Sequence, residues 1–326
     1  MRIDIIGAGS LGLLLAGKLI SSGNEVRLWC RSEQQCRELT SNGLTVSYED
    51  GGAAISVPGD SFSAEPVSKY PQRQLINPGD ITLITVKQMV LHNDLPEILR
   101  PLQARKAEII CFQNGCGHLE MLRELLPQAS LWAAVTTEAA KRKTLTEVIH
   151  AGRGEICIGK SSHPINKNEL NSQDLNNGGA ISFVQALAAA GFNASLSKEV
   201  DTIIYRKLLI NAVINPLTAI WRVPNGELLA SPERVQLMKE LYTEAVRVYD
   251  ACGITYEKHT WEAIVEVCRA TSGNISSMLA DVLASRETEI RWINGSIVNM
   301  GRQRGIEVPL HRYIFGLVEG MTVRER

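Results

Sequence analysis

The chain has almost no net charge. Its 34 Lys and Arg are offset by 35 Asp and Glu, which leaves −1 at neutral pH over 326 residues. This balance gives no bulk attraction to nucleic acid or to an anionic lipid surface. We therefore predict that neither is a partner, and that any anionic ligand must be met by local positive charge.

Paired cysteines, metal motifs and long apolar runs are lacking as well. The seven cysteines are odd in number and scattered, with no CxxC pair and no signal peptide, which predicts reduced thiols in a cytoplasmic protein. The apolar run LGLLLAGKLI is broken by Lys18 and is too short to span a membrane. With no HExxH motif and no paired CxxC, the sequence predicts no metal site. No internal repeat or low-complexity tract appears.

The length and the amino terminus indicate what the chain does have. A chain of 326 residues exceeds what one core usually holds, so two domains are expected. The segment begins with an apolar strand over residues 3–6, followed by GAGSLG and a helix up to Ser22. Gly23 stops that helix, and residues 26–29 form a second strand. This order is a βαβ unit.

The GxGxxG motif at 7–12 is typical of a dinucleotide-binding loop. Gly7 permits the tight turn, Gly9 lets the backbone approach a pyrophosphate, and Gly12 lets the helix pack close to the sheet. The N–H groups at the start of the helix are donors for phosphates. The whole loop, including Ala8, Ser10 and Leu11, is therefore predicted to bind a dinucleotide cofactor.

The end of the second strand bears on which dinucleotide is bound. NAD-binding units usually place Asp or Glu there, whereas this chain has Cys30-Arg31-Ser32. A guanidinium can bind a 2′-phosphate with two hydrogen bonds, so Arg31 favours NADP. Glu33 is the alternative, because it lies close enough in sequence to be the acid of an NAD site.

Further strands follow in the same alternating order. Strand-like runs cover 81–87 and 108–115, and another lies within 131–140. Lys87, Asn114 and the loop at 136–140 each follow the end of a strand, where ligands bind in an open parallel sheet. Residues 147–160 are predicted to form a β-hairpin, and the polar stretch at 161–179 shows no chemistry. One more helix and strand then complete a Rossmann-type domain over 1–197.

The remaining residues, 198–326, are predicted to be entirely helical. One helix begins at Lys198 and should end or kink near Asn215, because Pro216 follows. A second helix runs from Ser231, as N-cap, to Gly253, and residues 274–305 read as one more long helix. The fold class is therefore α/β, a doubly wound parallel sheet followed by an all-helical domain, with a substrate cleft expected between the two.

The first helix of the second domain carries an unusual polar row. Lys207, Asn211 and Asn215 are spaced four apart, so they lie on one face, although the residues around them are apolar. A snorkelling lysine and two amides that cap local backbone would be the structural explanation. Three such coincidences on one face, on the first helix after the nucleotide domain, weaken that explanation.

Several segments together resemble the ketopantoate reductase (2-dehydropantoate 2-reductase) family, over nearly the whole chain. The matching segments are GAGSLG, Lys87, QNG, the loop ending in Ala139-Ala140, YRKLLINAVINPLTAIW, PNGEL, NISSML and TEIRWING. The resemblance implies reduction of 2-dehydropantoate by NADPH in pantothenate biosynthesis. The stretch at 161–179 is longer than the family pattern, and Tyr205 replaces a tryptophan found in some members.

The resemblance also implies a role for each matching residue. Lys207 takes the place of the proton donor, and Glu289 that of an active-site glutamate that contacts either cofactor ribose or substrate. The implied substrate-binding residues are Lys207, Asn114, Asn211, Asn215, Asn225, Asn274 and Ser277, where Ser277 holds the substrate carboxylate. The implied cofactor-binding residues beyond the glycine loop are Arg31, Lys87, Asn114, Ala140 and Glu289.

Two other functions fit the same sequence. A relative on this fold would reduce another branched 2-oxo acid, which activity tests would distinguish. A non-catalytic NADP(H) sensor would be expected to lack Lys207 or Glu289, and both are present. The chain is expected to act as a monomer or homodimer on a small-molecule substrate.

Overall fold

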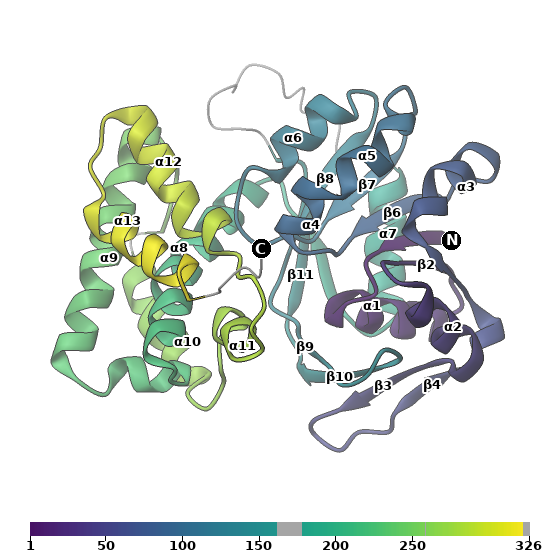
Figure 1. The fold of residues 1–326 in the computed structure, drawn as a ribbon, viewed down its shortest axis with the longest axis horizontal. Coiled ribbons are helices and arrows are strands. Elements are labelled where there is room, and N and C mark those ends of the chain that lie inside the picture. Colours follow the sequence, from purple (N-terminus) through teal and green to yellow (C-terminus); the bar gives the residue numbers. More distant parts are fainter. Residues whose placement is uncertain (162–177, 258, 322–326) are drawn as a thin grey trace. The chain divides into compact units, whose positions relative to one another are not determined.

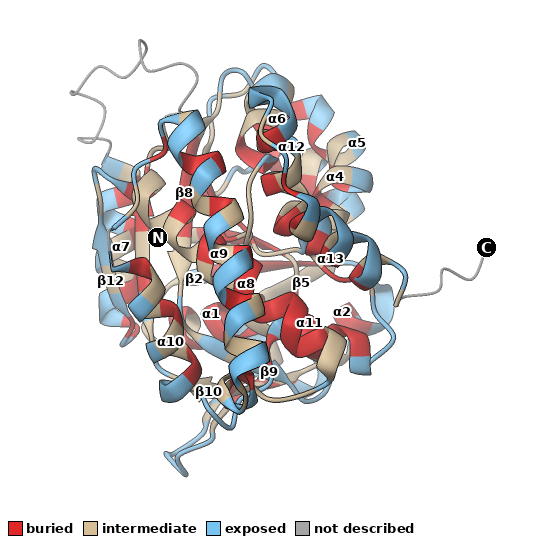
Figure 2. Cartoon of the chain, turned by 90° about the vertical axis from the view of Figure 1, so that its left-hand side faces the viewer, coloured by how far each residue is buried: buried red, intermediate tan, exposed pale blue. Residues whose placement is uncertain are grey.

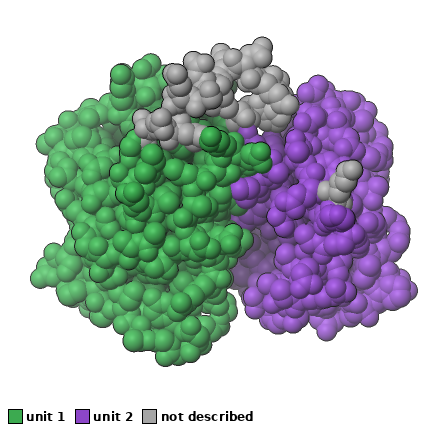
Figure 3. All heavy atoms as spheres, turned by 180° about the vertical axis from the view of Figure 1, so that it is seen from behind, with its two compact units in different colours: residues 1–113, 118–162, 168–200 green, residues 114–117, 163–167, 201–326 purple. Residues whose placement is uncertain are grey.

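The computed structural model describes residues 1–161, 178–257 and 259–321. The described chain divides into two compact units, which are coloured in Figure 3. Unit 1 holds the described residues up to 113, from 118 to 161, and from 178 to 200. Unit 2 holds 201–321 and, from the middle of the chain, the short segment 114–117. The polar stretch predicted at 161–179 lies almost wholly outside the described residues.

Unit 1 is built on an eight-stranded sheet (Figure 1). The strand order is β12-β11-β8-β7-β6-β1-β2-β5, parallel from β8 to β5, with β11 antiparallel to β8. The strands are β1 (Arg2–Ile6), β2 (Glu25–Cys30), β5 (Ser63–Pro66), β6 (Ile81–Ile84), β7 (Glu108–Cys111), β8 (Ser130–Thr136), β11 (Glu155–Gly159) and β12 (Asn193–Leu196).

Helices connect these strands and share their core. The helices of unit 1 are α1 (Ser10–Ser21), α2 (Glu33–Asn42), α3 (Tyr70–Ile76), α4 (Gln88–Asn93), α5 (Leu95–Leu99), α6 (His118–Leu125) and α7 (Gly178–Ala189). Leu14 of α1 and Phe183 of α7 are fully buried in one cluster with Ile5 of β1. Near-continuous apolar strands are typical of a parallel sheet covered on both faces. The α/β prediction for this part of the chain is confirmed.

A second, four-stranded sheet was not predicted. Its order is β4-β3-β10-β9, formed by β3 (Leu44–Tyr48), β4 (Ile55–Val57), β9 (Ala139–Arg142) and β10 (Glu147–Gly152). The predicted hairpin at 147–160 is wrong, because β10 pairs with β3 and β9 whereas β11 joins the large sheet beside β8. Hydrophobic alternation marks both strands, but it carries no information on which strand each one pairs with.

Unit 2 is helical, as predicted, and its buried residues form a cluster of their own. Figure 2 colours the buried residues of the chain red and the exposed ones pale blue. Its helices are α8 (Val200–Trp221), α9 (Pro232–Cys252), α10 (Thr260–Ala270), α11 (Ser277–Leu283), α12 (Asn294–Arg304) and α13 (Pro309–Glu319), with short 3-10 turns at Asn225–Leu229 and Ile290–Trp292. The predicted caps of α9 are both present: the Ser231 side chain accepts a hydrogen bond from Arg234 N–H, and Gly253 is left-handed with φ 66°.

Helix α8 continues through Pro216 to Trp221, so the predicted end near Asn215 is wrong, and the alternative of a kink there stays a prediction. By length and composition alone it is apolar enough to cross a membrane, yet 61% of its most apolar window is buried inside the protein. It therefore reads as a core helix of unit 2.

The prediction of one long helix over 274–305 is wrong. Helix α11 ends at Leu283, and α12 begins only at Asn294. The Arg286 N–H returns to the Asp281 carbonyl, and Ser285 has a positive φ of 51°, which ends the helix. The apolar periodicity of the sequence continues through this break, so the break could not be predicted from it. The break leaves Glu289 as the N-cap of the 3-10 turn Ile290–Trp292.

Candidate active site

The glycine loop of unit 1 has the geometry that a dinucleotide requires. Gly7 has φ 111°, and a Cβ on Gly12 would come within 1.9 Å of the Gly7 carbonyl oxygen, so neither position accepts a side chain. Gly9 differs, because no atom lies within 4 Å of the place where its Cβ would be. Open space at Gly9, at the N-terminus of the twelve-residue helix α1, fits a pyrophosphate.

Neighbouring groups hold this loop in place. The Ala8 carbonyl accepts a 2.8 Å hydrogen bond from the side-chain amide of Gln35, and the Gly7 carbonyl accepts one of 2.8 Å from the Thr85 hydroxyl. The Ser10 hydroxyl accepts from the Arg142 N–H at 3.1 Å, and Leu11 is half-buried in the first turn of α1. Gln35 and Thr85 were missed by the sequence analysis, because a buried glutamine and a strand-end threonine carry no motif.

The segment after β2 presents a cation to solvent. Arg31 is exposed, and Ser32 is the N-cap of α2, where its side chain accepts from the Gln35 N–H at 3.3 Å. Glu33 forms an exposed 3.5 Å ion pair with Arg37, one turn along α2. The carboxylate that could have served an NAD ribose therefore has a neighbouring cation of its own.

Two further residues predicted to contact the cofactor lie in unit 1. Lys87 is exposed and is the N-cap of α4, just after β6, which ends at Ile84, three residues earlier than predicted. Ala140 lies in strand β9 opposite His150, and not in a loop. The side chain of His150 is buried and contacts the buried carboxylate of Glu138, which precedes β9.

Unit 2 brings together three of the predicted site residues. Burial lowers the pKa of Lys207 to about 8, while the nearby Glu289 carboxylate acts in the opposite direction. The side-chain amide of Asn114 donates to Glu289 at 3.3 Å. Gly115 lets the segment that carries Asn114 pack against Trp292. Its φ is 83°, and a Cβ there would lie 2.3 Å from the Trp292 carbonyl oxygen. A half-buried amine and a carboxylate thus share one site.

The two asparagines after Lys207 differ from most buried amides. Asn211 is half-buried and Asn215 is buried, both on α8 one and two turns beyond Lys207. Within the described part of the chain, the side chains of Asn211 and Asn215 make no hydrogen bond. Neither side chain has a polar atom that is buried without a partner, so both amides keep solvent-accessible groups that a ligand could bind.

The remaining predicted substrate residues are arranged differently. Asn225 is buried, with its side-chain N–H donating to Thr271 at 2.9 Å and its side-chain oxygen buried without a partner among the described residues. Its backbone N–H binds the Asn274 carbonyl. Asn274 and Ser277 are both exposed. Asn225 begins the 3-10 turn Asn225–Leu229, Asn274 lies between α10 and α11, and Ser277 is the first residue of α11.

Ser276, next to the predicted Ser277, is buried and has more hydrogen-bond partners among the described residues. Ser276 is buried, caps α11 by accepting from the Leu279 N–H, and lies 2.7 Å from the Thr218 hydroxyl on α8. Thr218 in turn donates to the carbonyls of Ile214 and Asn215. The sequence signal for Ser276 was its place before an apolar run, as an N-cap requires.

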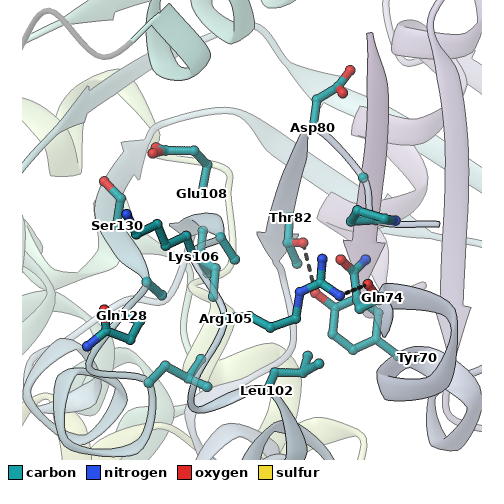
Figure 4. A pocket seen from close by; sticks show the side chains of 16 residues that line it. Tyr70, Gln74, Asp80, Thr82, Leu102, Arg105, Lys106, Glu108, Gln128 and Ser130 are labelled. Atoms are coloured by element: carbon teal, nitrogen blue, oxygen red, sulfur yellow. Dashed lines mark hydrogen bonds between the residues drawn. The ribbon is translucent and has the colours of Figure 1, made fainter. Parts of the chain in front are cut away.

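Unit 1 contains a pocket of about 470 Å³ at the edge of the sheet opposite to the glycine loop (Figure 4). Its lining includes Asp80, Glu108 and Ser130, which stand at the amino ends of β6, β7 and β8. Ligands of open parallel sheets bind at the carboxyl ends of the strands. The pocket is therefore not part of the candidate active site.

Comparisons with known proteins point to one family. The family model "Ketopantoate reductase PanE/ApbA" matches residues 3–163, and its C-terminal counterpart matches 199–322. A 2-dehydropantoate 2-reductase of Vibrio cholerae is 32% identical over 317 residues, covering 97% of this chain and 96% of that protein. One of Bacillus subtilis is 29% identical over 98% of this chain and 97% of that protein.

Solved structures agree. A PanE/ApbA family ketopantoate reductase from Ralstonia eutropha has a TM-score of 0.84 at 27% identity, covering 99% of this chain and 98% of that one. A D-mandelate dehydrogenase, solved with NADH and anilino(oxo)acetate, has a TM-score of 0.82 at 23% identity and covers 99% and 98%. At that identity the second likeness concerns the fold alone.

Proposed function

Because this chain belongs to the ketopantoate reductase family, we propose that it reduces 2-dehydropantoate to pantoate with NADPH, a step of pantothenate biosynthesis. The observation that carries the proposal is the polar row of α8, in which Lys207, with a pKa lowered to about 8, precedes the unpaired amides of Asn211 and Asn215. A reductase of 2-oxo acids needs one acid for the carbonyl oxygen and neutral donors for the rest of the substrate.

Lys207 is proposed as the catalytic acid. Reduction of a ketone places negative charge on the carbonyl oxygen, and an ammonium at hydrogen-bond distance stabilises that charge and supplies the proton. Burial lowers the pKa of Lys207 to about 8, so the amine is mostly protonated at neutral pH and gives up its proton more readily than an exposed lysine. The Glu289 carboxylate keeps the charged form accessible, and Asn114 orients that carboxylate.

The asparagines are proposed to bind the substrate without adding charge. Positions 207, 211 and 215 of α8 span about 12 Å at 1.5 Å per residue, which suits an extended small molecule. Amides can both donate to a carboxylate and accept from a hydroxyl. Asn225, Asn274 and Ser277 are proposed as further substrate contacts; Asn225 also donates to Thr271, and the other two are exposed.

The cofactor is assigned to the Rossmann-type domain over 1–197, and catalysis to the helical domain over 198–326. When bound, NADPH supplies the hydride for the substrate carbon. The open face of Gly9 and the N-terminus of α1 would hold its pyrophosphate. Arg31, exposed after β2, would bind the 2′-phosphate, and its preference for that group supports NADP over NAD. Lys87 and Ala140 remain proposed cofactor contacts.

Purified protein should oxidise NADPH when 2-dehydropantoate is added. The same assay with branched 2-oxo acids that lack the terminal hydroxyl tests the alternative substrate class. Faster turnover of such an acid would replace the proposed substrate, and no turnover of any 2-oxo acid would remove the proposal. A cytoplasmic location is also proposed, supported by the absence of a disulfide among the seven cysteines, which all lie in described residues.

A further inference from the structure

Pro216 leaves a gap in the hydrogen bonding of α8. In an α-helix each carbonyl accepts from the N–H four residues later, and proline has no N–H to give. The carbonyl of Ala212 is therefore deprived of its normal donor, in a residue that is fully buried. A buried carbonyl without a partner costs on the order of 1–3 kcal/mol. Ala212 follows Asn211 directly and precedes Asn215 by three residues.

A side chain from another helix supplies the missing donor. The amide of Asn294, the first residue of α12, donates to the Ala212 carbonyl oxygen at 2.9 Å. Asn294 is itself fully buried. The bond thus replaces the α8 hydrogen bond that Pro216 cannot make.

The Asn294 amide is held in place by a second partner. Its N–H group also lies 3.0 Å from Nδ1 of His311, and Nε2 of His311 lies 2.9 Å from the Leu241 carbonyl oxygen. Since a carbonyl only accepts, Nε2 carries the proton and Nδ1 accepts from Asn294. The backbone N–H of His311 is bound in turn by the Glu244 carboxylate. Four helices, α8, α9, α12 and α13, are tied to the Pro216 turn.

We propose that Asn294 is a positioning residue for the substrate row: by donating to Ala212 in place of Pro216, it fixes the helix turn that carries Asn211 and Asn215. The inference rests on the proposed function, because it concerns the alignment of the side chains assigned to the substrate. It goes beyond that function in assigning a task to a residue that touches no reacting group. A proline in this helix is tolerated because Asn294 completes its hydrogen bonding.

The test is a double-mutant cycle on Asn294 and Pro216. Asn294→Leu should lower kcat/KM for 2-dehydropantoate at least tenfold and leave KM for NADPH within about twofold, because the glycine loop is untouched. Pro216→Ala restores an N–H that can reach Ala212, so adding it to Asn294→Leu should recover most of the loss. Asn299→Leu, exposed on the same helix, is the matched control and should stay within about twofold of wild type.

A second comparison holds even if Asn294→Leu does not fold alone. In the Pro216→Ala background, Asn294→Leu should change kcat/KM by less than about threefold, because the helix no longer needs the amide. Thermal unfolding, and the rise in Tm that 2-dehydropantoate causes, provide readouts that do not depend on turnover. The substrate-induced rise should shrink in Asn294→Leu and return in the double variant.

The outcomes separate cleanly. A folded Asn294→Leu protein with kcat/KM within twofold of wild type would overturn the proposal, as would a loss in the Pro216→Ala background equal to that in wild type. A lower Tm with unchanged substrate kinetics would show a purely structural role, which also overturns it. Failure of the proposed function gives a different result, because the wild-type protein would then not reduce 2-dehydropantoate.

Discussion

Replacing Lys207 with Met should move activity and stability in opposite directions. Methionine has a similar length and no charge, so the change removes the amine and leaves most of the packing. Burial lowers the pKa of Lys207 from 10.5 to about 8, which means that the folded state disfavours the charged form by about 3 kcal/mol. Removing the amine should therefore stabilise the folded state. Part of that stabilisation is lost, because the Glu289 carboxylate stays charged without the lysine beside it. We expect a net gain of about 1–2 kcal/mol in the free energy of unfolding at pH 7.

The pH dependence of this gain follows from the same pKa. Below pH 8 the amine is charged in both the folded and the unfolded chain, so the buried ammonium destabilises the folded state by its full amount. Between about pH 8 and 10.5 the folded chain holds a neutral amine while the unfolded chain still binds the proton, and the cost disappears. The advantage of Lys207→Met should therefore be largest at neutral pH and vanish near pH 10.5.

Activity should fall by about 10²–10⁴-fold in kcat, the usual contribution of a positioned acid, equivalent to about 3–5 kcal/mol in the barrier. In wild type, kcat should decline above about pH 8, where Lys207 loses its proton. The assays are NADPH oxidation and chemical unfolding at several pH values, with Lys198→Met, at an exposed position, as the matched control. Near-normal turnover, or a variant less stable than wild type at pH 7, would refute the reasoning.

Three more predictions concern the cofactor, the amides and the helical core. Arg31→Ala should raise KM for NADPH far more than KM for NADH, whereas Arg37→Ala, on the exposed face of α2, should not; equal use of both cofactors by wild type would contradict the NADP assignment. Asn211→Leu and Asn215→Leu should each keep a folded, NADPH-binding protein but lose about 0.5–1.5 kcal/mol of transition-state stabilisation, measured as kcat/KM for 2-dehydropantoate. At least one of the two should discriminate less against a 2-oxo acid without the terminal hydroxyl, and full activity of both would remove the row from the substrate site. Burial lowers the pKa of His311 to about 4, so its contribution to stability is complete above about pH 6.5 and lost as the pH falls towards 4. The difference in unfolding free energy between wild type and His311→Gln should shrink over that range, and a constant difference would count against the neutral histidine.

The parts predicted from sequence are those in which the local signal and the tertiary role coincide. GAGSLG follows the first strand, and the backbone leaves no room for a side chain at Gly7 or Gly12. These few residues were therefore enough to predict the Rossmann-type fold and its dinucleotide-binding loop. The caps Ser231 and Gly253 are equally local. The row of Lys207, Asn211 and Asn215 was visible because polar residues at helical spacing stand out in an apolar segment.

The parts that were missed depend on contacts between distant segments. Pairing of β10 with β3, rather than with β11, is decided about a hundred residues away in the chain. At Pro216 the Ala212 carbonyl accepts instead from Asn294, a residue of another helix that a propensity rule for proline does not include. The break between α11 and α12 rests on a left-handed serine, Ser285, in a position that periodicity does not mark.

The segment 114–117 belongs with unit 2, although the chain on either side of it belongs to unit 1. Gly115 packs against the Trp292 carbonyl, and the Cys116 N–H donates to the same oxygen at 3.3 Å. The helical unit is consequently not a contiguous stretch of sequence. A truncated fragment that starts near residue 198 would lack these four residues, and with them the Cys116 N–H that donates to Trp292 and the Asn114 amide that donates to Glu289. Such a fragment should be a poor candidate for separate expression or for exchange between relatives, unless a surrogate for the missing loop is supplied with it.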